Sequence, residues 1–214
     1  MIKKTKCSVC DNENILSDEI NVIKFVMPNT EGAKLYFDLW HFPIEKCSSC
    51  GYASKDISLC ENSNIKYAKN KFNQSIINNL NDARTNSVEA YLNASIYYNL
   101  IGNEKLEVLC LLQAGDMVFG EILYWKEHIL TEDEKGEDLY EFAKEIYDKG
   151  QNLLIDYIEK NPEDIDMQLL FVGMLSDDKE NKPYCRVYLN NLRKKQLNDN
   201  QKKIFEFLEN DINL

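Results

Sequence analysis

Two pairs of cysteines near the start of the chain have the spacing of a metal site. Cys7 and Cys10 enclose two residues, and so do Cys47 and Cys50, which are followed by Gly51. Two-residue spacing lets both thiolates of a pair reach one cation from a tight turn, and a glycine after the pair relieves the backbone where its amides turn back toward sulfur. Four soft thiolates favour a tetrahedral zinc ion. The pattern therefore predicts a structural Zn2+ site with these four cysteines as ligands.

Two other interpretations of these cysteines stay open. Free cysteines are often buried as small hydrophobic residues. A single Cys-x-x-Cys pair can also be a redox motif, although that motif begins a helix in a βαβ setting, which neither pair has. The 36 residues between Cys10 and Cys47 exceed the roughly 15–20 of the compact zinc pattern. A site closed by four protein ligands leaves no place for water or substrate, so we expect the metal to support folding and not catalysis.

The remaining cysteines and the two histidines offer little material for catalysis. Cys60 could replace a ligand or remain a surface thiol, whereas Cys110 and Cys185 lie in apolar helical patterns and are predicted to be core residues. With only His41 and His128 present, a histidine-based catalytic set is not expected. The sequence also contains no Gly-rich phosphate loop, no GxSxG and no HExxH. We therefore predict that the protein is not an enzyme.

Composition and charge narrow the class of fold and partner. Of the 214 residues 44% are hydrophobic, enough for a sizeable core, and only 8 Gly and 4 Pro are present, which favours helices over an all-β fold. The net charge is −11, and the residues after Cys60 carry 28 acidic against 18 basic side chains. Such a charge repels phosphate backbones. Nucleic acid is thus a poor candidate, and a protein or peptide partner of basic character is expected.

The compartment is predicted from the cysteines and from two segments. The basic start of the chain lacks the apolar segment of a secretory signal. The most apolar stretch, 106–125, contains Glu107, Asp116 and Glu121, so it is predicted to be a buried helix and not a membrane span. Seven cysteines without a secretory signal argue against a disulfide framework. We expect a cytoplasmic protein with no membrane association.

Two short strands are predicted to position the cysteine pairs. Residues 20–26 and 35–42 are β-branched and aromatic runs, separated by the turn-like residues 28–32. If these strands run antiparallel, they bring both cysteine pairs together, as in a zinc ribbon with an extended hairpin. Residues 1–57 are therefore predicted to form a zinc-ribbon-like module.

Helical periodicity replaces the strand pattern in the rest of the chain. The predicted helices are 62–80, 86–101, 104–128, 133–160, 164–176, 183–196 and 199–210. Thr131 and Glu134 have the spacing of a capping box, Pro183 suits a first helical turn, and Asn198 can cap the last helix. Consecutive helices with short polar links favour tetratricopeptide-like antiparallel hairpins, with a one-off helical bundle as the alternative. Residues 61–214 are thus predicted to be a helical domain, which makes the protein mainly α.

Three functions are compatible with these observations. The favoured one is a non-enzymatic adaptor, in which a zinc ribbon is joined to helical hairpins that bind a protein or peptide. The second is a nucleic-acid-associated zinc ribbon with Lys3, Lys4, Lys6 and Lys46 as its contact patch. The third is a thiol-based redox or zinc-release sensor that uses the same four cysteines. Tyrosines of the helical part are expected mainly in the core, with a few lining a peptide groove.

The N-terminal motifs are similar to those of one uncharacterised bacterial family. The aromatic run 36–40 followed by Cys-Ser-Ser-Cys-Gly-Tyr-Ala at 47–53, and preceded by the pair at 7–10, resembles the family named domain of unknown function 2225. Its members pair a CPxC near the start with an aromatic strand leading into CPxCGYA and a tetratricopeptide-like region. This chain has Ser8 and Ser48 where proline is usual, which is expected to loosen the knuckles without removing a ligand. The resemblance implies an architecture but no biochemical role.

Overall fold

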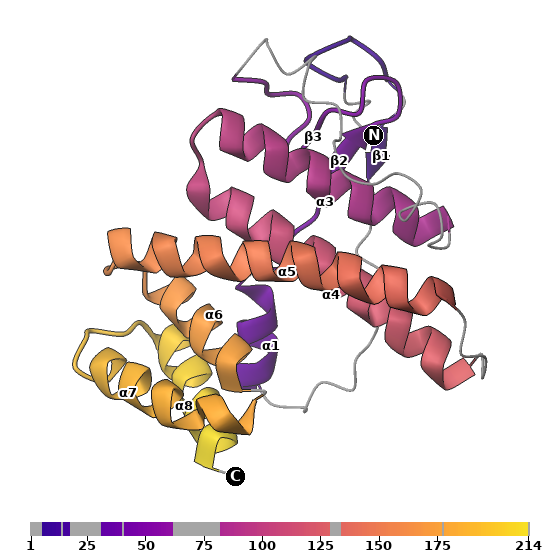
Figure 1. Ribbon diagram of the computed structural model, residues 1–214. Helices are drawn as coiled ribbons and strands as arrows, with labels where there is room; N and C mark the ends of the chain where they lie inside the picture. The colour runs from indigo at the N-terminus through magenta and orange to yellow at the C-terminus, as the bar shows by residue number, and fades with distance from the viewer. Residues whose placement is uncertain are drawn as a thin grey trace. The chain divides into compact units, whose positions relative to one another are not determined.

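The computed structural model describes most of the chain. The described residues are 6–13, 15–17, 31–39, 41–61, 82–128, 134–176 and 178–213. They are mainly helical, with a small antiparallel sheet near the N-terminus and consecutive helices joined by short turns (Figure 1). The predicted fold class is confirmed, since the pattern of helical hairpins agrees with the tetratricopeptide-like arrangement. The predicted strand 20–26 and the predicted helix 62–80 lie outside the described residues.

The sheet joins the two cysteine pairs. Its strands are β1 (Ile15–Ser17), β2 (Glu45–Cys47) and β3 (Ala53–Ser54), in the order β1-β2-β3 with both neighbouring pairs antiparallel. Ile15 lies opposite Cys47 in the register. The first cysteine pair thus precedes β1, and the second begins at the end of β2 and turns into β3.

The strand predicted over 35–42 is wrong, because much of this segment forms the helix α1 (Glu31–Asp38). Its aromatic and branched residues have strand propensity, but Leu35, Tyr36 and Leu39 also share one helical face. All three pack against the buried cluster formed by the C-terminal helices. Burial of this face therefore decides the local structure, and tertiary packing overrides the intrinsic preference.

The contacts group the chain into two compact units. The first contains residues 1–23 and 42–153, and the second contains 24–41 and 154–214. This grouping differs from the division expected between residues 57 and 61, because the cysteine module is grouped with the following helices and α1 is grouped with the C-terminal ones. The division into a zinc-ribbon-like module and a helical domain stays a prediction.

The first unit contains a helical hairpin of α3 (Asp82–Leu100) and α4 (Glu104–His128), which lie side by side in Figure 1. Gly102 ends α3 with a φ of 73°, the left-handed conformation that glycine adopts at no steric cost. The backbone N–H of Asn103 then donates to the carbonyl of Tyr98 at 2.8 Å. This turn lies between the helices predicted over 86–101 and 104–128.

The helix α5 (Glu134–Lys160) packs against α4 through two glycines. A Cβ atom at Gly150 would lie 2.8 Å from Leu112 Cδ2, and one at Gly115 would lie 3.2 Å from the ring of Tyr147. Each glycine therefore lets a large side chain of the other helix approach the backbone.

Three helices, the short helix α1 and the C-terminal end of α5 belong to the second unit. The three helices are α6 (Ile165–Ser176), α7 (Lys182–Leu192) and α8 (Asp199–Asn213), with a 3₁₀ turn at Lys179–Asn181 before α7. Pro183 lies in the first turn of α7, as predicted. The predicted cap of α8 is also confirmed, since Asn198 Oδ1 accepts from the Gln201 N–H at 2.9 Å and the Gln201 side chain accepts from the Asn198 N–H at 3.0 Å. The predicted cap at Thr131 lies outside the described residues.

Glycines also allow α1 to sit close to α6 and α8. A Cβ atom at Gly32 of α1 would lie 2.5 Å from the carbonyl oxygen of Lys203 in α8, and one at Gly173 of α6 would overlap the ring of Tyr36. The Tyr36 hydroxyl donates to the carbonyl of Leu170 at 3.2 Å. These contacts fix α1 as an integral helix of the second unit.

Candidate metal centre

The first cysteine pair forms a tight knuckle held by two backbone hydrogen bonds. The Asp11 N–H donates to the carbonyl of Cys7 at 2.8 Å, and the Cys7 N–H donates to the carbonyl of Asn12 at 2.9 Å. To make this turn Asp11 adopts a φ of 60°, in the left-handed region that aspartate tolerates better than most non-glycine residues. This role of Asp11 was not predicted from the sequence.

The second pair repeats this geometry. The Gly51 N–H donates to the carbonyl of Cys47 at 2.9 Å, and the Cys47 N–H donates to the carbonyl of Tyr52 at 2.8 Å. Gly51 has a φ of 77°, so the glycine has the backbone role that the sequence predicted for it. The two knuckles are equivalent, with Asp11 in the first standing where Gly51 stands in the second.

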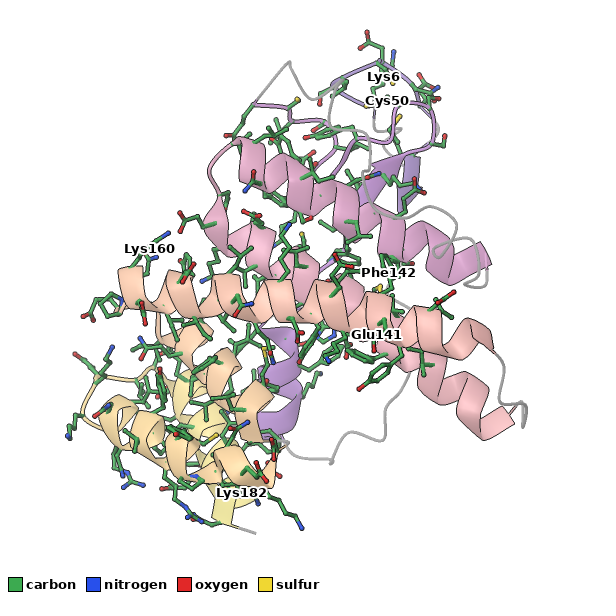
Figure 2. The ribbon with its side chains drawn as sticks, in the orientation of Figure 1. Lys6, Cys50, Glu141, Phe142, Lys160 and Lys182 are labelled. Carbon is green, nitrogen blue, oxygen red and sulfur yellow. The ribbon has the colours of Figure 1, made fainter. Side chains whose placement is uncertain are left out.

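The two knuckles bring all four predicted ligand atoms together. The Sγ atoms of Cys7, Cys10, Cys47 and Cys50 lie within 4.8 Å of one another, and Figure 2 labels Cys50 among the loops of the module. Across the knuckles the Cys7–Cys50 sulfurs are 3.6 Å apart and the Cys10–Cys47 sulfurs 3.5 Å. These distances exclude disulfides, whose sulfurs lie about 2.0 Å apart. They are close to the edge of about 3.8 Å of a sulfur tetrahedron with metal bonds of 2.3 Å. The four cysteines could therefore hold a metal ion.

Backbone amides in each knuckle donate to a sulfur. Burial raises the pKa of Cys7, and hydrogen bonds from the amides two and three residues later oppose this effect only in part. At Cys47 burial acts in the same direction, but the corresponding amides of Cys50 and Ser49, together with neighbouring thiols, outweigh it and lower the pKa. Since a metal binds the thiolate form, these N–H groups stabilise the state that a ligand needs.

Side chains tie the first knuckle to its surroundings. The backbone N–H and the hydroxyl of Ser8 each lie 3.0 Å from the carbonyl oxygen of Ile57, to which both donate. Asn12 donates from its side chain to the Ser49 hydroxyl and thus links the two knuckles. Proline has no N–H to donate. The Ser8 N–H thus makes a hydrogen bond that a proline at this position could not make. The looser knuckle expected from the replacement of proline stays a prediction.

No family model, curated protein or solved structure matches the chain. The resemblance to domain of unknown function 2225 therefore stays a prediction. In the part of the chain that the structure describes, every helix is too short or too polar to cross a bilayer.

The helix α3 supports the module with polar side chains. Asn93 donates to the carbonyl of Gly51 at 3.0 Å, directly beside the second knuckle. Lys46 of β2 is only 5% exposed, and its ammonium pairs with the carboxylate of Glu89. Lys46 therefore points into this contact and does not belong to an exposed basic patch.

Three tyrosines of α3 bind the backbone of the module and of Glu61, which follows it. Tyr91 donates to the carbonyl of Phe42. Tyr97 and Tyr98 accept from the backbone N–H groups of Glu61 and Lys55, at 3.2 and 3.0 Å. All three rings are buried, and burial raises the pKa of Tyr98 to about 12. The hydroxyl groups of these buried tyrosines make hydrogen bonds to the backbone that packs on α3. The three tyrosines therefore do not line a peptide groove.

The other candidate residues lie apart from the four sulfurs. Cys60 is half-buried and does not belong to the four-cysteine cluster. Cys110 and Cys185 are buried, as predicted, and burial raises the pKa of both thiols. His41 stacks on Phe37, with ring centroids 3.3 Å apart, at the end of α1. The side chain of His128 lies outside the described part of α4.

Proposed function

We propose that the four cysteines bind one structural Zn2+ ion and that the protein is a non-enzymatic adaptor for a protein or peptide. The distances between the four sulfur atoms are the observation that carries the zinc assignment, because they fit one tetrahedral ion and nothing shorter links them. Four thiolates complete the coordination of zinc and leave no place for a substrate.

A structural role agrees with the small size of the module. Its sheet has two- and three-residue strands, which are too short to be stable without additional support. Metal binding contributes its free energy to folding when the site does not exist in the unfolded chain. We therefore infer that zinc holds the two knuckles together and so forms the surface that α3 contacts through Asn93 and its tyrosines.

Chelation distinguishes a structural ion from an incidental one. Hydrogen exchange is followed by mass spectrometry on the zinc-loaded chain, before and after removal of the metal. We expect protection to be lost in peptides covering residues 6–13 and 41–57 and to persist in α6, α7 and α8. The Cys60→Ser variant is the matched control, because this thiol lies outside the cluster. Unchanged protection of the module after metal removal contradicts the structural role.

The adaptor role is supported by the helical hairpins and by the surface of α5. Between residues 138 and 149 of this helix four acidic side chains (Asp138, Glu141, Glu145 and Asp148) and two basic ones (Lys144 and Lys149) are exposed, so this stretch has an excess of negative charge. Tyr140 is 46% exposed on the same stretch. An acidic surface with an aromatic group suits a partner of basic character. Free cysteines suit a reducing compartment, so we place the protein in the cytoplasm. A peptide array in which the chain holds no peptide of any composition contradicts the adaptor role.

One alternative has an observation in its favour. Cys10 is exposed, and its sulfur lies 3.5 Å from that of Cys47, so a peroxide could oxidise this pair. Two thiols and one peroxide would give a disulfide and two waters, with loss of the metal. Metal content that is unchanged after mild peroxide treatment excludes such a sensor. The nucleic-acid alternative has less support, since Lys46 is buried in its pair with Glu89 and Lys6 pairs with Glu13 at 3.6 Å.

A further inference from the structure

The helix α1 packs on helices that are distant from it in sequence. Residues 24–41, which include α1, are grouped with residues 154–214, whereas the flanking segments 1–23 and 42–153 form the other unit. Figure 1 shows α1 beside α6 and α8. The rest of the second unit is one continuous C-terminal segment of the chain. The helix α1 therefore contacts the C-terminal helices as a separate segment, as a bound peptide does.

The residues by which α1 is held have the spacing of a helical ligand. Their positions follow the pattern i, i+3, i+4 and i+7, so they share one helical face: Gly32, Leu35, Tyr36 and Leu39. The three large side chains pack against the buried cluster of the C-terminal helices, and Gly32 lies against the carbonyl of Lys203. The same spacing anchors amphipathic helices that bind to an apolar surface of another protein.

The helices α6 and α8 present a surface that fits these anchors. We call it the α1-binding face and define it by Leu170, Gly173, Lys203 and Phe207. Gly173 has no side chain where the ring of Tyr36 lies, and a Cβ atom there would overlap that ring. The carbonyl of Leu170 accepts from the Tyr36 hydroxyl at 3.2 Å, and the ring of Phe207 has its centroid 6.3 Å from that of Tyr36. The face thus combines a space for one aromatic ring with an acceptor for its hydroxyl.

An ion pair fixes the direction in which a helix lies on this face. The ammonium of Lys203 is 2.7 Å from the carboxylate of Glu31, which belongs to the first turn of α1. An acidic side chain at this end of a helix also interacts favourably with the helix dipole. The face therefore favours a helical segment whose N-terminal end is acidic and lies at Lys203.

The helix α1 is less deeply buried than the other helices of the second unit. Gly32 is its one buried residue among those that the structure describes, whereas α7 buries three side chains and α8 four. An isolated helix of eight residues is not stable in water, so α1 keeps its helical structure only while it is bound. Elements with little buried apolar surface open at the lowest free energy. We therefore expect α1 to detach before α6, α7 and α8 unfold.

We propose that the α1-binding face recognises an amphipathic helical segment of a partner protein, and that α1 occupies this face until the partner displaces it. The partner segment has the chemistry of α1: an acidic residue in its first turn, then a small residue, and a tyrosine four residues after the small one. The proposal rests on the adaptor function and names one class of peptide that the adaptor binds. Since only chains with a detached α1 can bind the partner, the occupied face lowers the apparent affinity. The helix α1 is thus autoinhibitory.

Fluorescence anisotropy with the sequence of α1 itself as the probe tests this proposal. A labelled thirteen-residue peptide with the sequence of residues 29–41 is titrated with the zinc-loaded full chain, either wild type or Tyr36→Ala. The variant removes the ring and the hydroxyl that hold α1 on the face. We expect it to bind the peptide at least tenfold more tightly than the wild type does. Tyr184→Ala is the matched control, because this tyrosine of α7 is 66% exposed, and it should bind the peptide as the wild type does.

Further variants locate the bound peptide. In the Tyr36→Ala chain, the added change Gly173→Ala places a methyl group where the tyrosine of the peptide would lie and should weaken binding about tenfold. Asn191→Ala, at an exposed position of α7, is the matched control and should leave the affinity unchanged. A peptide with alanine in place of its tyrosine, and a scrambled peptide of the same composition, should each bind at least tenfold more weakly.

Circular dichroism establishes that each variant is folded. If Tyr36→Ala is not, Tyr36→Phe takes its place, because it keeps the ring and loses only the hydrogen bond to the carbonyl of Leu170. For this milder variant we expect the peptide to bind about threefold more tightly than to the wild type. An affinity equal to that of the wild type overturns the proposal for either variant.

The other outcomes separate this proposal from the adaptor function itself. Binding that Gly173→Ala leaves unchanged, or a peptide that binds neither the wild type nor the variant, overturns the proposal. The adaptor function stays in place unless the peptide array also shows no binding. Sedimentation that shows wild-type dimers, and monomers for Tyr36→Ala, assigns the face to α1 of a second copy of the chain and likewise overturns the proposal.

Discussion

Asp11 and Gly51 occupy the same backbone position in the two halves of the metal centre. Both have positive φ, 60° and 77°, and the N–H of each donates to the carbonyl of the first cysteine of its pair, at 2.8 and 2.9 Å. Only the second knuckle uses glycine, so the first depends on the tolerance of aspartate for the left-handed conformation. The two halves therefore have the same backbone geometry but carry different residues at this position, so they should differ in which substitutions they tolerate.

The effects of substitutions at Asp11 and Gly51 on the stability of the module should follow a predictable order. A β-branched residue is strained in the left-handed region, so Asp11→Val and Gly51→Val should each destabilise the zinc-loaded module by about 1–2 kcal/mol or more. Asp11→Gly should change stability by less than about 1 kcal/mol, because relief of strain is offset by the entropy of the unfolded chain. Zinc competition with a coloured chelator measures the effect. A stronger loss of zinc in Asp11→Gly than in Asp11→Val contradicts the account.

The docking of the module on α3 should depend on the Tyr98 hydroxyl. The change Tyr98→Phe leaves the Lys55 N–H without its 3.0 Å acceptor and should cost about 1–3 kcal/mol in urea unfolding. Tyr140→Phe is the control, because this ring is exposed. Equal stability of Tyr98→Phe and wild type contradicts the docking role.

The same tyrosine should make stability fall at high pH. Burial raises the pKa of Tyr98 from 10.0 to about 12 in the folded chain, so the neutral form is favoured by folding. The stabilising contribution is complete below pH 10 and decreases as pH rises from 10 through 12. Between these limits the free energy of unfolding of Tyr98→Phe should fall less steeply than that of the wild type. If the free energies of unfolding of the variant and the wild type fall in parallel between pH 10 and 12, burial does not raise the pKa of Tyr98 and the prediction is contradicted.

The contact of α1 with α6 should appear as strong coupling between two residues. Gly173→Ala places a methyl group in the ring of Tyr36 and should destabilise the chain by about 1–3 kcal/mol. In the Tyr36→Ala background the same change should cost at least about 1 kcal/mol less, because the ring is absent. Additive effects in this double-mutant cycle contradict the position of α1.

The buried pair of Lys46 and Glu89 should be sensitive to loss of one partner. Glu89→Gln leaves the Lys46 ammonium buried without its carboxylate and should cost about 2–3 kcal/mol, with partial recovery on adding Lys46→Met. The exposed pair of Lys6 and Glu13 is the control, and Lys6→Met should change stability by less than about 1 kcal/mol. A similar loss for both pairs would contradict the difference in burial.

The sequence was most informative where local geometry decides the outcome. Two-residue spacing within each cysteine pair constrains the turn, so the four cysteines could be identified as one cluster before their surroundings were known. Long apolar periodicity predicted α4 over 104–128, with the same bounds as the structure. The positive φ angles of Gly51 and Gly102 are also a local effect, because glycine has no Cβ atom and adopts this conformation without steric cost.

The missed features depend on residues that are distant in sequence. The aromatic residues of 35–42 have strand propensity, and only packing against α6 and α8 makes α1 a helix. The hydrogen bond from the Lys55 N–H to the Tyr98 hydroxyl joins residues 43 positions apart. The periodicity of α3 does not indicate which of its tyrosines makes such a bond. Asp11 carried a weak signal, since it follows Cys10 as Gly51 follows Cys50 and aspartate is among the few residues that tolerate positive φ.

The zinc content of the freshly purified full chain tests the central claim most directly. Elemental analysis should find one zinc per chain in the wild type and in Cys60→Ser, whose thiol lies outside the four-cysteine cluster. Cys47→Ser should contain well under one. A wild-type chain with little zinc, a different metal in its place, or a Cys47→Ser variant that keeps its zinc would contradict the assignment of Cys7, Cys10, Cys47 and Cys50 as the ligands of a structural zinc ion.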